Sequence, residues 1–292
     1  MKYAPKRLSK PLTKALLLSA VGSFAAITTV HARCADQGTE CKIDGGIYHI
    51  ELPEKDGSAA PVVIFLHGAG GNGEAVLRNR NMVPQLLKRG YAVIGPTGGG
   101  RPGSRFKTLW NFYPGFTGMR DDAAFLRAVA DDAAKRFGTS RDKVILAGFS
   151  AGAFMVNYLA CDNPETFAAY APVAGGFWKP HPKTCNGPVK LFHSHGWTDR
   201  TVPLEGRRLG GGRFVQGDIA YGLDLWRKAN GCIEMRPDKN WVDNSFWRRS
   251  WNTCKTGGAL EFALYPGGHT VPKGWADMVV DWFEKVTEDG GS

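Results

Sequence analysis

Short apolar runs alternate with longer amphipathic stretches along most of this 292-residue chain. Continuous apolar runs such as residues 61–66 are typical of buried strands, whereas apolar residues spaced three and four apart indicate helices packed on a sheet. The pattern predicts strands near residues 47–52, 62–66, 91–95, 143–147, 170–174, 189–194 and 260–265, and helices over 74–89, 119–137, 151–160, 217–230 and 274–286. Strands that alternate with helices predict an α/β fold with a mainly parallel central sheet and helices on both faces.

The stretch 236–253 breaks this alternation. It contains Trp241, Phe246, Trp247 and Trp251 within a short span. Such a segment fits either an extra hairpin or a surface patch of aromatic side chains. Because large aromatic side chains contribute most when buried, packing in the core is favoured over contact with a ligand.

The first 32 residues have the pattern of a secretory signal peptide. Five basic residues and no acidic residue precede a largely apolar run over residues 15–30, and Val30-His31-Ala32 provides a small-residue cleavage site. The apolar run is too short and too interrupted to span a bilayer permanently. The sequence therefore predicts a signal peptide over 1–32, a single catalytic domain over 33–292, and a secreted or periplasmic protein without a membrane anchor.

Charge adds little to this picture. The formal net charge of +10 includes the five basic residues of the signal peptide, so the mature chain carries 10 − 5 = +5. That excess does not indicate nucleic-acid binding, and Arg207-Arg208 and Arg248-Arg249 are expected on solvated faces. We expect no nucleic-acid partner and a monomeric protein.

The strongest candidate for chemistry is Gly148-Phe149-Ser150-Ala151-Gly152, which directly follows the apolar run 144–147. A Gly-x-Ser-x-Gly motif between a strand and a helix is the pattern of a nucleophile elbow, where a sharp turn exposes the serine hydroxyl. The alternative is that the two glycines only allow close packing while Ser150 caps the helix. The elbow is favoured because suitable catalytic partners follow in the chain.

A serine nucleophile needs a histidine as base and an acid that orients the histidine. We assign the base to His269, which lies in a glycine-rich loop after the strand at 260–265, and the acid to Asp199, which follows the strand at 189–194. The carboxyl ends of parallel strands are where such sheets place ligand-handling groups. Asp218 and Asp224 are the competitors for the acid, but both fall in the amphipathic helix over 217–230.

The pair His193 and His195 could in principle bind zinc, because both side chains of a His-x-His on a strand face one side. No third ligand stands close in the sequence, so no metal is expected. The loop His67 to Gly73 after the strand at 62–66 lacks the Gly-Lys-Ser/Thr ending of a nucleotide-binding loop. No cofactor is therefore expected.

An oxyanion hole requires two backbone N–H donors, one after the nucleophile and one from an early strand-to-helix loop. Ala151 supplies the first. The glycine-rich loop that begins at His67 supplies the second, and Ala69 is the expected donor, with Gly70 as the alternative.

Taken together, these motifs resemble the secreted α/β-hydrolase esterases of the polyhydroxybutyrate depolymerase and feruloyl or acetylxylan esterase group. The resemblance spans about residues 43 to 286 and implies the α/β-hydrolase fold and a metal-free triad of Ser150, Asp199 and His269. The motifs that carry it are Leu66-His67-Gly68, Trp110-Asn111-Phe112, Asp121-Asp122, Gly148-Phe149-Ser150-Ala151-Gly152, His195-Gly196-Trp197-Thr198-Asp199 and Gly267-Gly268-His269.

The resemblance also implies substrate contacts. It places Trp110, with Asn111 and Phe112, at the mouth of the acyl pocket, where an exposed indole would face the acyl group; the alternative is a buried clamp under the loop. His67 and Trp197 are the other residues expected to contact substrate.

Six cysteines in an exported chain indicate three disulfides, for which fifteen connectivities exist. Sequence proximity and the resemblance favour Cys34 with Cys41, Cys161 with Cys185, and Cys232 with Cys254.

The sequence thus predicts a secreted serine esterase that acts on an ester substrate, with polyhydroxyalkanoate-type polyesters or their oligomers as the first substrate class. The alternative is a feruloyl or acetylxylan esterase that acts on plant polysaccharide. A non-catalytic binding protein with the hydrolase fold and a peptidase are the less favoured readings.

Overall fold

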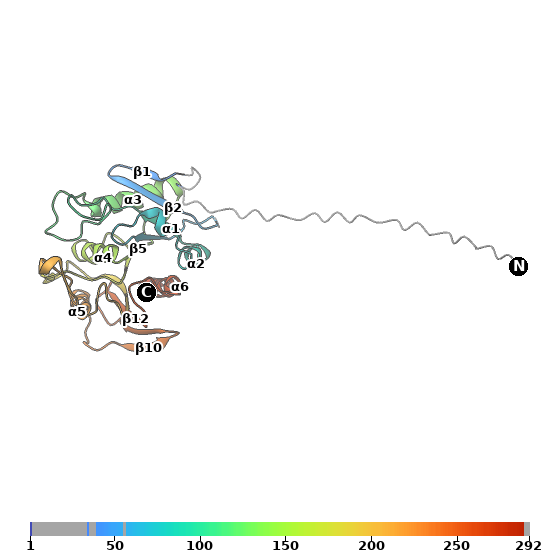
Figure 1. Cartoon of the computed structure of the whole chain (residues 1–292). Helices are drawn as coiled ribbons and strands as arrows, with labels where there is room; N and C mark the ends of the chain where they lie inside the picture. Colours follow the sequence, from blue (N-terminus) through green and yellow to red (C-terminus); the bar gives the residue numbers. More distant parts are fainter. Residues whose placement is uncertain (2–33, 35–38, 55–56, 289–292) are drawn as a thin grey trace. The chain divides into compact units, whose positions relative to one another are not determined.

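A ten-stranded sheet forms the centre of the protein within the residues that the computed structural model describes, which are 1, 34, 39–54 and 57–288. Its order is β1-β2-β4-β3-β5-β6-β7-β12-β11-β10. Figure 1 shows the two ends of this order, with β1 at the top and β10 at the bottom. The strands are β1 (Cys41–Ile43), β2 (Gly46–Glu51), β3 (Val62–Leu66), β4 (Ala92–Pro96), β5 (Val144–Phe149), β6 (Ala169–Val173), β7 (Lys190–Gly196), β10 (Lys239–Asp243), β11 (Phe246–Trp251) and β12 (Ala259–Tyr265). The six strands from β4 to β12 in this order pair in parallel, and antiparallel strands flank them on both sides. The mainly parallel sheet is therefore confirmed.

Helices cover both faces of this sheet. They are α1 (Gly73–Leu77), α2 (Val83–Lys88), α3 (Asp122–Phe137), α4 (Ala151–Asp162), α5 (Ile219–Ala229) and α6 (Trp275–Glu288). Because successive side chains of a strand point to opposite faces, Ile64 and Leu66 of β3 join one core cluster with α3, α4 and α5. Val63 and Phe65 join the other cluster, with α1, α2 and α6.

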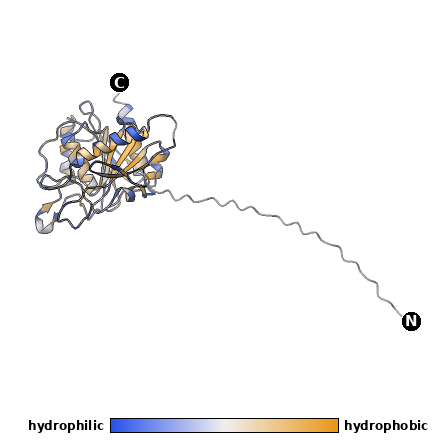
Figure 2. Cartoon of the chain, turned by 90° about the horizontal axis from the view of Figure 1, so that it is seen from above, coloured by the Kyte–Doolittle hydropathy of each residue, from blue (hydrophilic) through white to orange (hydrophobic). Residues whose placement is uncertain are grey.

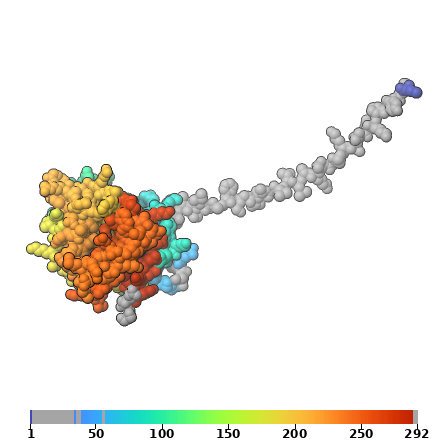
Figure 3. All heavy atoms as spheres, turned by 90° about the horizontal axis from the view of Figure 1, so that it is seen from below, coloured from blue at the N-terminus to red at the C-terminus, as the bar shows by residue number. Residues whose placement is uncertain are grey.

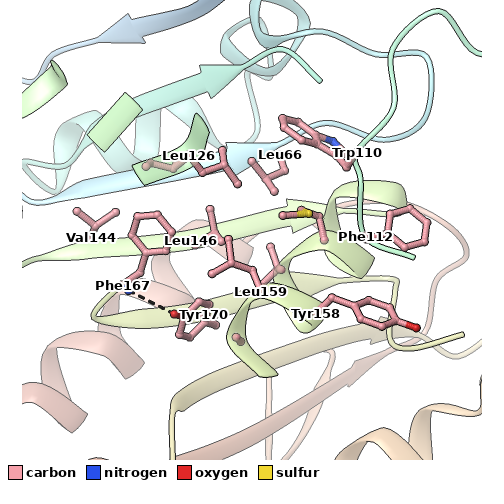
Figure 4. Packing of buried hydrophobic residues seen from close by; sticks show 14 of the residues in the cluster. Leu66, Trp110, Phe112, Leu126, Val144, Leu146, Tyr158, Leu159, Phe167 and Tyr170 are labelled. Carbon is pink, nitrogen blue, oxygen red and sulfur yellow. Dashed lines mark hydrogen bonds between the residues drawn. The ribbon is translucent and has the colours of Figure 1, made fainter. Parts of the chain in front are cut away.

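The apolar composition of the central strands follows from this double cover (Figure 2). Figure 4 shows the cluster on the α3 and α4 side, where Leu66, Leu146 and Leu159 lie between the sheet and the helices. The described residues from 34 onward belong to one compact unit.

One predicted helix divides. In place of one helix over 74–89, the structure has α1 and α2, separated by residues 78–82. Pro84 is the second residue of α2, a position where a helix tolerates proline, whereas in the middle of a longer helix its ring would clash with the preceding turn. The side chain of Asn79 also accepts a hydrogen bond from the N–H of Asn81 and so favours a turn.

Short elements were not predicted. They are β1, the two-stranded pair β8 (Arg208–Leu209) and β9 (Phe214–Val215), and a 3-10 turn between them. The stretch 236–253 forms the hairpin β10–β11, one of its two predicted forms. Phe246 and Trp251 are buried in it, whereas 46% of Trp247 is exposed.

Three disulfides join Cys34 to Cys41, Cys161 to Cys185, and Cys232 to Cys254, the pairs that were expected. The signal peptide and its cleavage site fall in residues 2–33, outside the described residues. None of the helices in the described part of the chain is long and apolar enough to cross a membrane.

Candidate active site

Ser150 lies at the turn between β5 and α4 and has an unusual backbone conformation. Its φ is 55° and its ψ is −116°, values that non-glycine residues rarely adopt. Such strain persists only where the surroundings enforce it, and it is concentrated at functional sites. The backbone of Ser150 therefore has the sharp turn expected of a nucleophile elbow.

The two glycines of the motif allow this turn to pack tightly. A Cβ atom on Gly152 would lie 2.3 Å from the carbonyl oxygen of Leu66, and one on Gly148 would lie 2.7 Å from the backbone of Gly152. Both distances are far below a van der Waals contact. The motif thus needs glycine at both positions because α4 starts directly against β3 and β5.

His269 and Asp199 meet across 70 residues of sequence. The Nδ1 atom of His269 lies 2.7 Å from Oδ2 of Asp199. The loops that carry them follow β12 and β7, which are parallel neighbours in the sheet with Tyr265 opposite Gly196. The N–H of Thr198 donates to the carbonyl of Gly267 and holds the two loops together.

The Asp199 carboxylate is buried but well provided with donors. Its Oδ1 atom accepts hydrogen bonds from the N–H groups of Thr201 and Val202, both at 2.8 Å. Burial opposes ionisation, but the hydrogen bonds from His269, Val202 and Thr201 outweigh it and lower the pKa of Asp199 below its usual value. Asp199 is therefore an ionised acceptor that keeps the proton of His269 on Nδ1.

His269 also lies against the elbow. Its ring centroid is 4.6 Å from that of Phe149, the residue directly before Ser150. The competing acids serve other purposes: Asp218 accepts from the N–H of Tyr221 at the start of α5, and Asp224 pairs with Arg227 and Lys228. The structure thus brings Asp199 and His269 to the carboxyl end of the parallel strands, where Ser150 also lies. Asp218 and Asp224 are not brought there.

The loop after β3 lies against the same elbow. A Cβ atom on Gly68 would be 3.5 Å from the Cβ of Ser150. The N–H of Gly70 donates to the carbonyl of Thr108 at 2.9 Å, so this amide is already engaged. Of the two donors considered in this loop, Ala69 is therefore favoured over Gly70. Ala151 is the first residue of α4, where backbone N–H groups have no partner within the helix.

The expected substrate contact of His67 is wrong. Its side chain is buried, Nε2 accepts from the N–H of Gly98 at 2.9 Å, and Nδ1 donates to the carbonyl of Gly68 at 2.7 Å. Burial lowers the pKa of His67 and keeps the ring neutral. With both ring nitrogens bonded to backbone, His67 fixes the glycine-rich loop and has no free atom for a substrate.

The exposed position expected for Trp110 is also wrong. The side chain is fully buried, and its indole N–H donates to the carbonyl of His67 at 2.9 Å. Its ring lies 4.9 Å from the His67 ring. Trp110 is thus the buried clamp that was the alternative reading. The neighbouring Phe112 is also buried and stacks on Phe154 of α4.

Trp197 is the expected substrate residue that remains accessible. Its side chain is 58% exposed, two residues before Asp199. The ring of Trp247 stands at 84° to it, with the centroids 6.4 Å apart. Trp247 is opposite Leu264 near the end of β12, so both indoles lie at the carboxyl end of the parallel strands, as does Ser150. In the sequence, Trp247 is recognisable only as one of the aromatic residues of the stretch 236–253.

A cluster of half-buried aromatic side chains was missed altogether. Trp178 contacts Tyr113, Phe116 and Phe214, and the guanidinium of Arg101 lies 4.4 Å from the Phe116 ring centroid. These residues come from two loops and the short strand β9, without periodicity, so no local sequence signal unites them. The segment before Trp178 abuts the elbow, because a Cβ on Gly175 would be 2.8 Å from the carbonyl oxygen of Ser150.

Metal ligands are not grouped in the part of the chain that the structure describes: no three His, Cys, Asp or Glu residues gather there. His193 and His195 instead contact each other, with Nε2 of His193 3.2 Å from Nδ1 of His195.

Comparisons with known proteins agree with this architecture. A family model described as alpha/beta hydrolase fold matches residues 61–269. The putative esterase NocK of Nocardia uniformis subsp. tsuyamanensis is 29% identical over 160 residues, 53% of this chain and 43% of NocK, so the chain matches less than half of that relative. The probable feruloyl esterase C of Aspergillus terreus is 25% identical over 270 residues, 87% of this chain and 89% of that protein.

Among solved structures, an acetyl xylan esterase from Aspergillus awamori matches with a TM-score of 0.61 at 16% sequence identity. The match covers 84% of this chain and 98% of that chain, and it is a likeness of fold. The family model covers well over half of the 292 residues and includes the strands from β3 to β12 and the elbow. The chain therefore belongs to the alpha/beta hydrolase fold family.

Proposed function

We propose that this protein is a serine esterase that hydrolyses carboxylic esters through Ser150, His269 and Asp199. The observation that carries the proposal is the 2.7 Å contact between His269 and Asp199, at the same sheet edge as the strained turn of Ser150. Serine, acid and histidine occur in this chain order in α/β hydrolases. The esterase names of the relatives support the same reaction class.

The chemistry follows from the tautomer of His269. Because Asp199 can only accept, Nδ1 of His269 carries a proton and Nε2 is free to act as base. Ser150 Oγ attacks the ester carbonyl carbon while its proton passes to His269 Nε2. The N–H groups of Ala69 and Ala151 bind the oxyanion. The alcohol then leaves with the proton from His269, and water hydrolyses the acyl-enzyme by the reverse sequence.

The first substrate class we propose is an ester carried by a plant polysaccharide, such as a feruloyl or acetyl ester. The match to the probable feruloyl esterase C extends over 87% of this chain, and half-buried aromatic side chains around Trp178 lie close to the elbow. Polyhydroxyalkanoate, the substrate class that the motifs first indicated, is the second candidate. The same triad would serve either ester, so the choice rests on binding.

We assign the polymer contact to Trp197 and Trp247. Trp247 lines a shallow groove of about 450 Å³ together with Asn240, Trp241, Val242, Arg248 and Arg249. The exposed ring of Trp197 lies next to that of Trp247. The hairpin that carries this groove lies on the face whose atoms are orange in Figure 3. Accessible indoles next to hydrogen-bonding side chains suit a polymer with both apolar and hydroxyl-bearing surfaces.

A labelling experiment and a substrate panel test the proposal. A fluorophosphonate should modify the intact protein at Ser150 alone, as mapped by mass spectrometry, and Ser150→Ala should remain unlabelled and correctly folded. The panel comprises methyl ferulate, acetylated xylan, polyhydroxybutyrate oligomers and a peptide amide. Hydrolysis of the peptide but none of the esters, or labelling of another residue, would contradict the assignment.

The location of the protein is a proposal as well. A signal peptide over 1–32 and three disulfides suit export to an oxidising compartment. Sequencing the N-terminus of the protein recovered from its native host tests it, because cleavage after Ala32 would leave Arg33 as the first residue.

A further inference from the structure

Two buried histidines near Asp199 have no part in the triad: His195 lies next to Asp199, and His193 lies next to His195. His193 and His195 occupy alternate positions of β7, so their side chains point to the same face of the sheet. They are 3% and 0% exposed, and their ring planes are inclined by 20° with the centroids 5.5 Å apart. A buried polar side chain is costly unless it is hydrogen-bonded, and two neighbouring imidazoles require a defined arrangement of protons.

The hydrogen bonds fix that arrangement. Nε2 of His195 lies 2.8 Å from the carbonyl oxygen of Val202, which can only accept, so this nitrogen carries the proton. Nδ1 of His195 is then the acceptor of the 3.2 Å contact with Nε2 of His193, which is the donor. Burial lowers the pKa of both histidines, so both rings stay neutral and the order of donors is maintained.

Val202 connects this chain of hydrogen bonds to the acid. Its N–H donates to Oδ1 of Asp199 at 2.8 Å, while its carbonyl accepts from His195. The peptide groups on both sides of Val202 are therefore held, one by the acid and one by the histidine. His195 Nε2 is also 3.7 Å from Oδ2 of Asp199, the oxygen that faces His269.

We propose that His195 is a positioning residue for the catalytic acid. Through Val202, His195 sets the orientation of the Asp199 carboxylate toward His269. His193 fixes the tautomer of His195. The inference rests on the esterase mechanism proposed above. The loop 197–202 is exposed to solvent at Trp197, yet the Asp199 side chain within it has to stay in one rotamer. A series of buried hydrogen bonds behind the loop meets this requirement. Misplacing a catalytic group by even about 1 Å can cost on the order of 10²-fold in rate.

A double-mutant cycle tests this role. We expect His195→Phe to lower kcat on a small soluble ester by roughly 10- to 100-fold with little change in KM, because the alignment of His269 is lost while substrate binding is not. In the Asp199→Asn background the same change should cost less than about threefold, because the acid through which His195 acts is already gone. Equal costs in both backgrounds would overturn the proposal and leave His195 a packing residue.

A second pair of variants covers the case in which His195→Phe fails to fold. His193→Gln keeps an N–H donor for His195 Nδ1, whereas His193→Met fills the space without one. Retention of most of kcat in the glutamine variant and a loss of several-fold or more in the methionine variant supports the chain of hydrogen bonds. Equal kcat in the two variants contradicts it. His49→Phe is the matched control, a buried histidine with a lowered pKa on the distant strand β2.

An activity-independent measurement separates this inference from the proposed function. The proton on His269 Nδ1 that is bonded to Asp199 should give a downfield NMR resonance in the native protein. We expect that resonance to shift or broaden in His195→Phe and to stay in place in His49→Phe. An unchanged resonance in His195→Phe would overturn the positioning role, whereas a native protein that shows the resonance but hydrolyses no ester would instead refute the esterase assignment.

Discussion

The indole N–H of Trp110 donates to the backbone carbonyl of His67 at 2.9 Å, and so holds the glycine-rich loop against the elbow of Ser150. Because this indole is fully buried, Trp110→Ala should cost about 3–5 kcal/mol of stability. Trp110→Phe keeps most of the apolar volume but loses the hydrogen bond, and should cost less.

In each Trp110 variant, activity on the acetyl ester and activity on the aromatic ester should fall to a similar extent. The reason is that the loop that supplies the Ala69 amide moves in both variants. Denaturant unfolding and kcat/KM on methyl ferulate and 4-nitrophenyl acetate measure these effects. A loss confined to the aromatic ester, with unchanged stability, would return Trp110 to the substrate pocket.

Replacing the acid should separate Asp199 from its competitors. Asp199→Asn is expected to lower kcat by about 10⁴-fold, because an asparagine can no longer hold the required tautomer of His269. Asp218→Asn is the matched control, since asparagine also caps a helix and the start of α5 is preserved. Steady-state kinetics of the two variants decide the assignment, and comparable losses in both would refute it.

Stability should fall in mild acid because of His193. Burial lowers its folded-state pKa below the ordinary value of 6.5, so the unfolded chain binds the proton more readily. The stability contributed by this group is complete above pH 6.5 and is lost as pH falls below it, by at most about 1.4 kcal/mol per pH unit.

His193→Gln cannot take up that proton, so the stability of this variant should depend less steeply on pH between 7 and 5. Urea unfolding of both proteins across that range provides the measurement. His195, which faces His193 and has Asp199 as its neighbouring acid, also has a lowered pKa. The stability of the variant should therefore still decrease somewhat as the pH falls. Parallel stability curves would show that His193 does not titrate on unfolding.

The exposed tryptophans should matter for polymers more than for small esters. We expect Trp197→Ala combined with Trp247→Ala to reduce hydrolysis of acetylated xylan by about 10-fold or more, while kcat/KM for 4-nitrophenyl acetate changes less than about threefold. Ile233→Ala is a suitable control, because it removes another exposed apolar side chain elsewhere on the surface. A larger loss on polyhydroxybutyrate than on xylan would favour the polyester, and equal losses on all substrates would place the pair outside substrate binding.

The sequence predicts the central sheet well because its strands are buried on both faces and read as unbroken apolar runs. The glycine motif also carries its own geometry, since only glycine permits the approach of Gly152 to Leu66. The failures at His67 and Trp110 have one physical cause. Whether the polar atoms of a buried ring have hydrogen-bond partners depends on distant backbone groups. For His67 one such group is the N–H of Gly98, 31 residues away, and a local sequence pattern does not indicate this contact.

The division of the helix predicted over 74–89 has a different origin. Its apolar spacing is helical throughout, but the proline at position 84 requires a new helix start that periodicity alone does not reveal. The aromatic cluster around Trp178 combines two loops with the short strand β9, and its assembly is a property of the tertiary structure alone.

The backbone of Ser150 has a consequence for attempts to engineer this protein. A φ of 55° with a ψ of −116° costs a serine on the order of 1–3 kcal/mol, and a glycine at the same place would adopt it without penalty. Ser150→Gly should therefore unfold at a higher temperature than the native protein and have no activity. Selection for thermal robustness alone would eliminate the proposed nucleophile, so directed evolution of this scaffold needs an activity screen at every round.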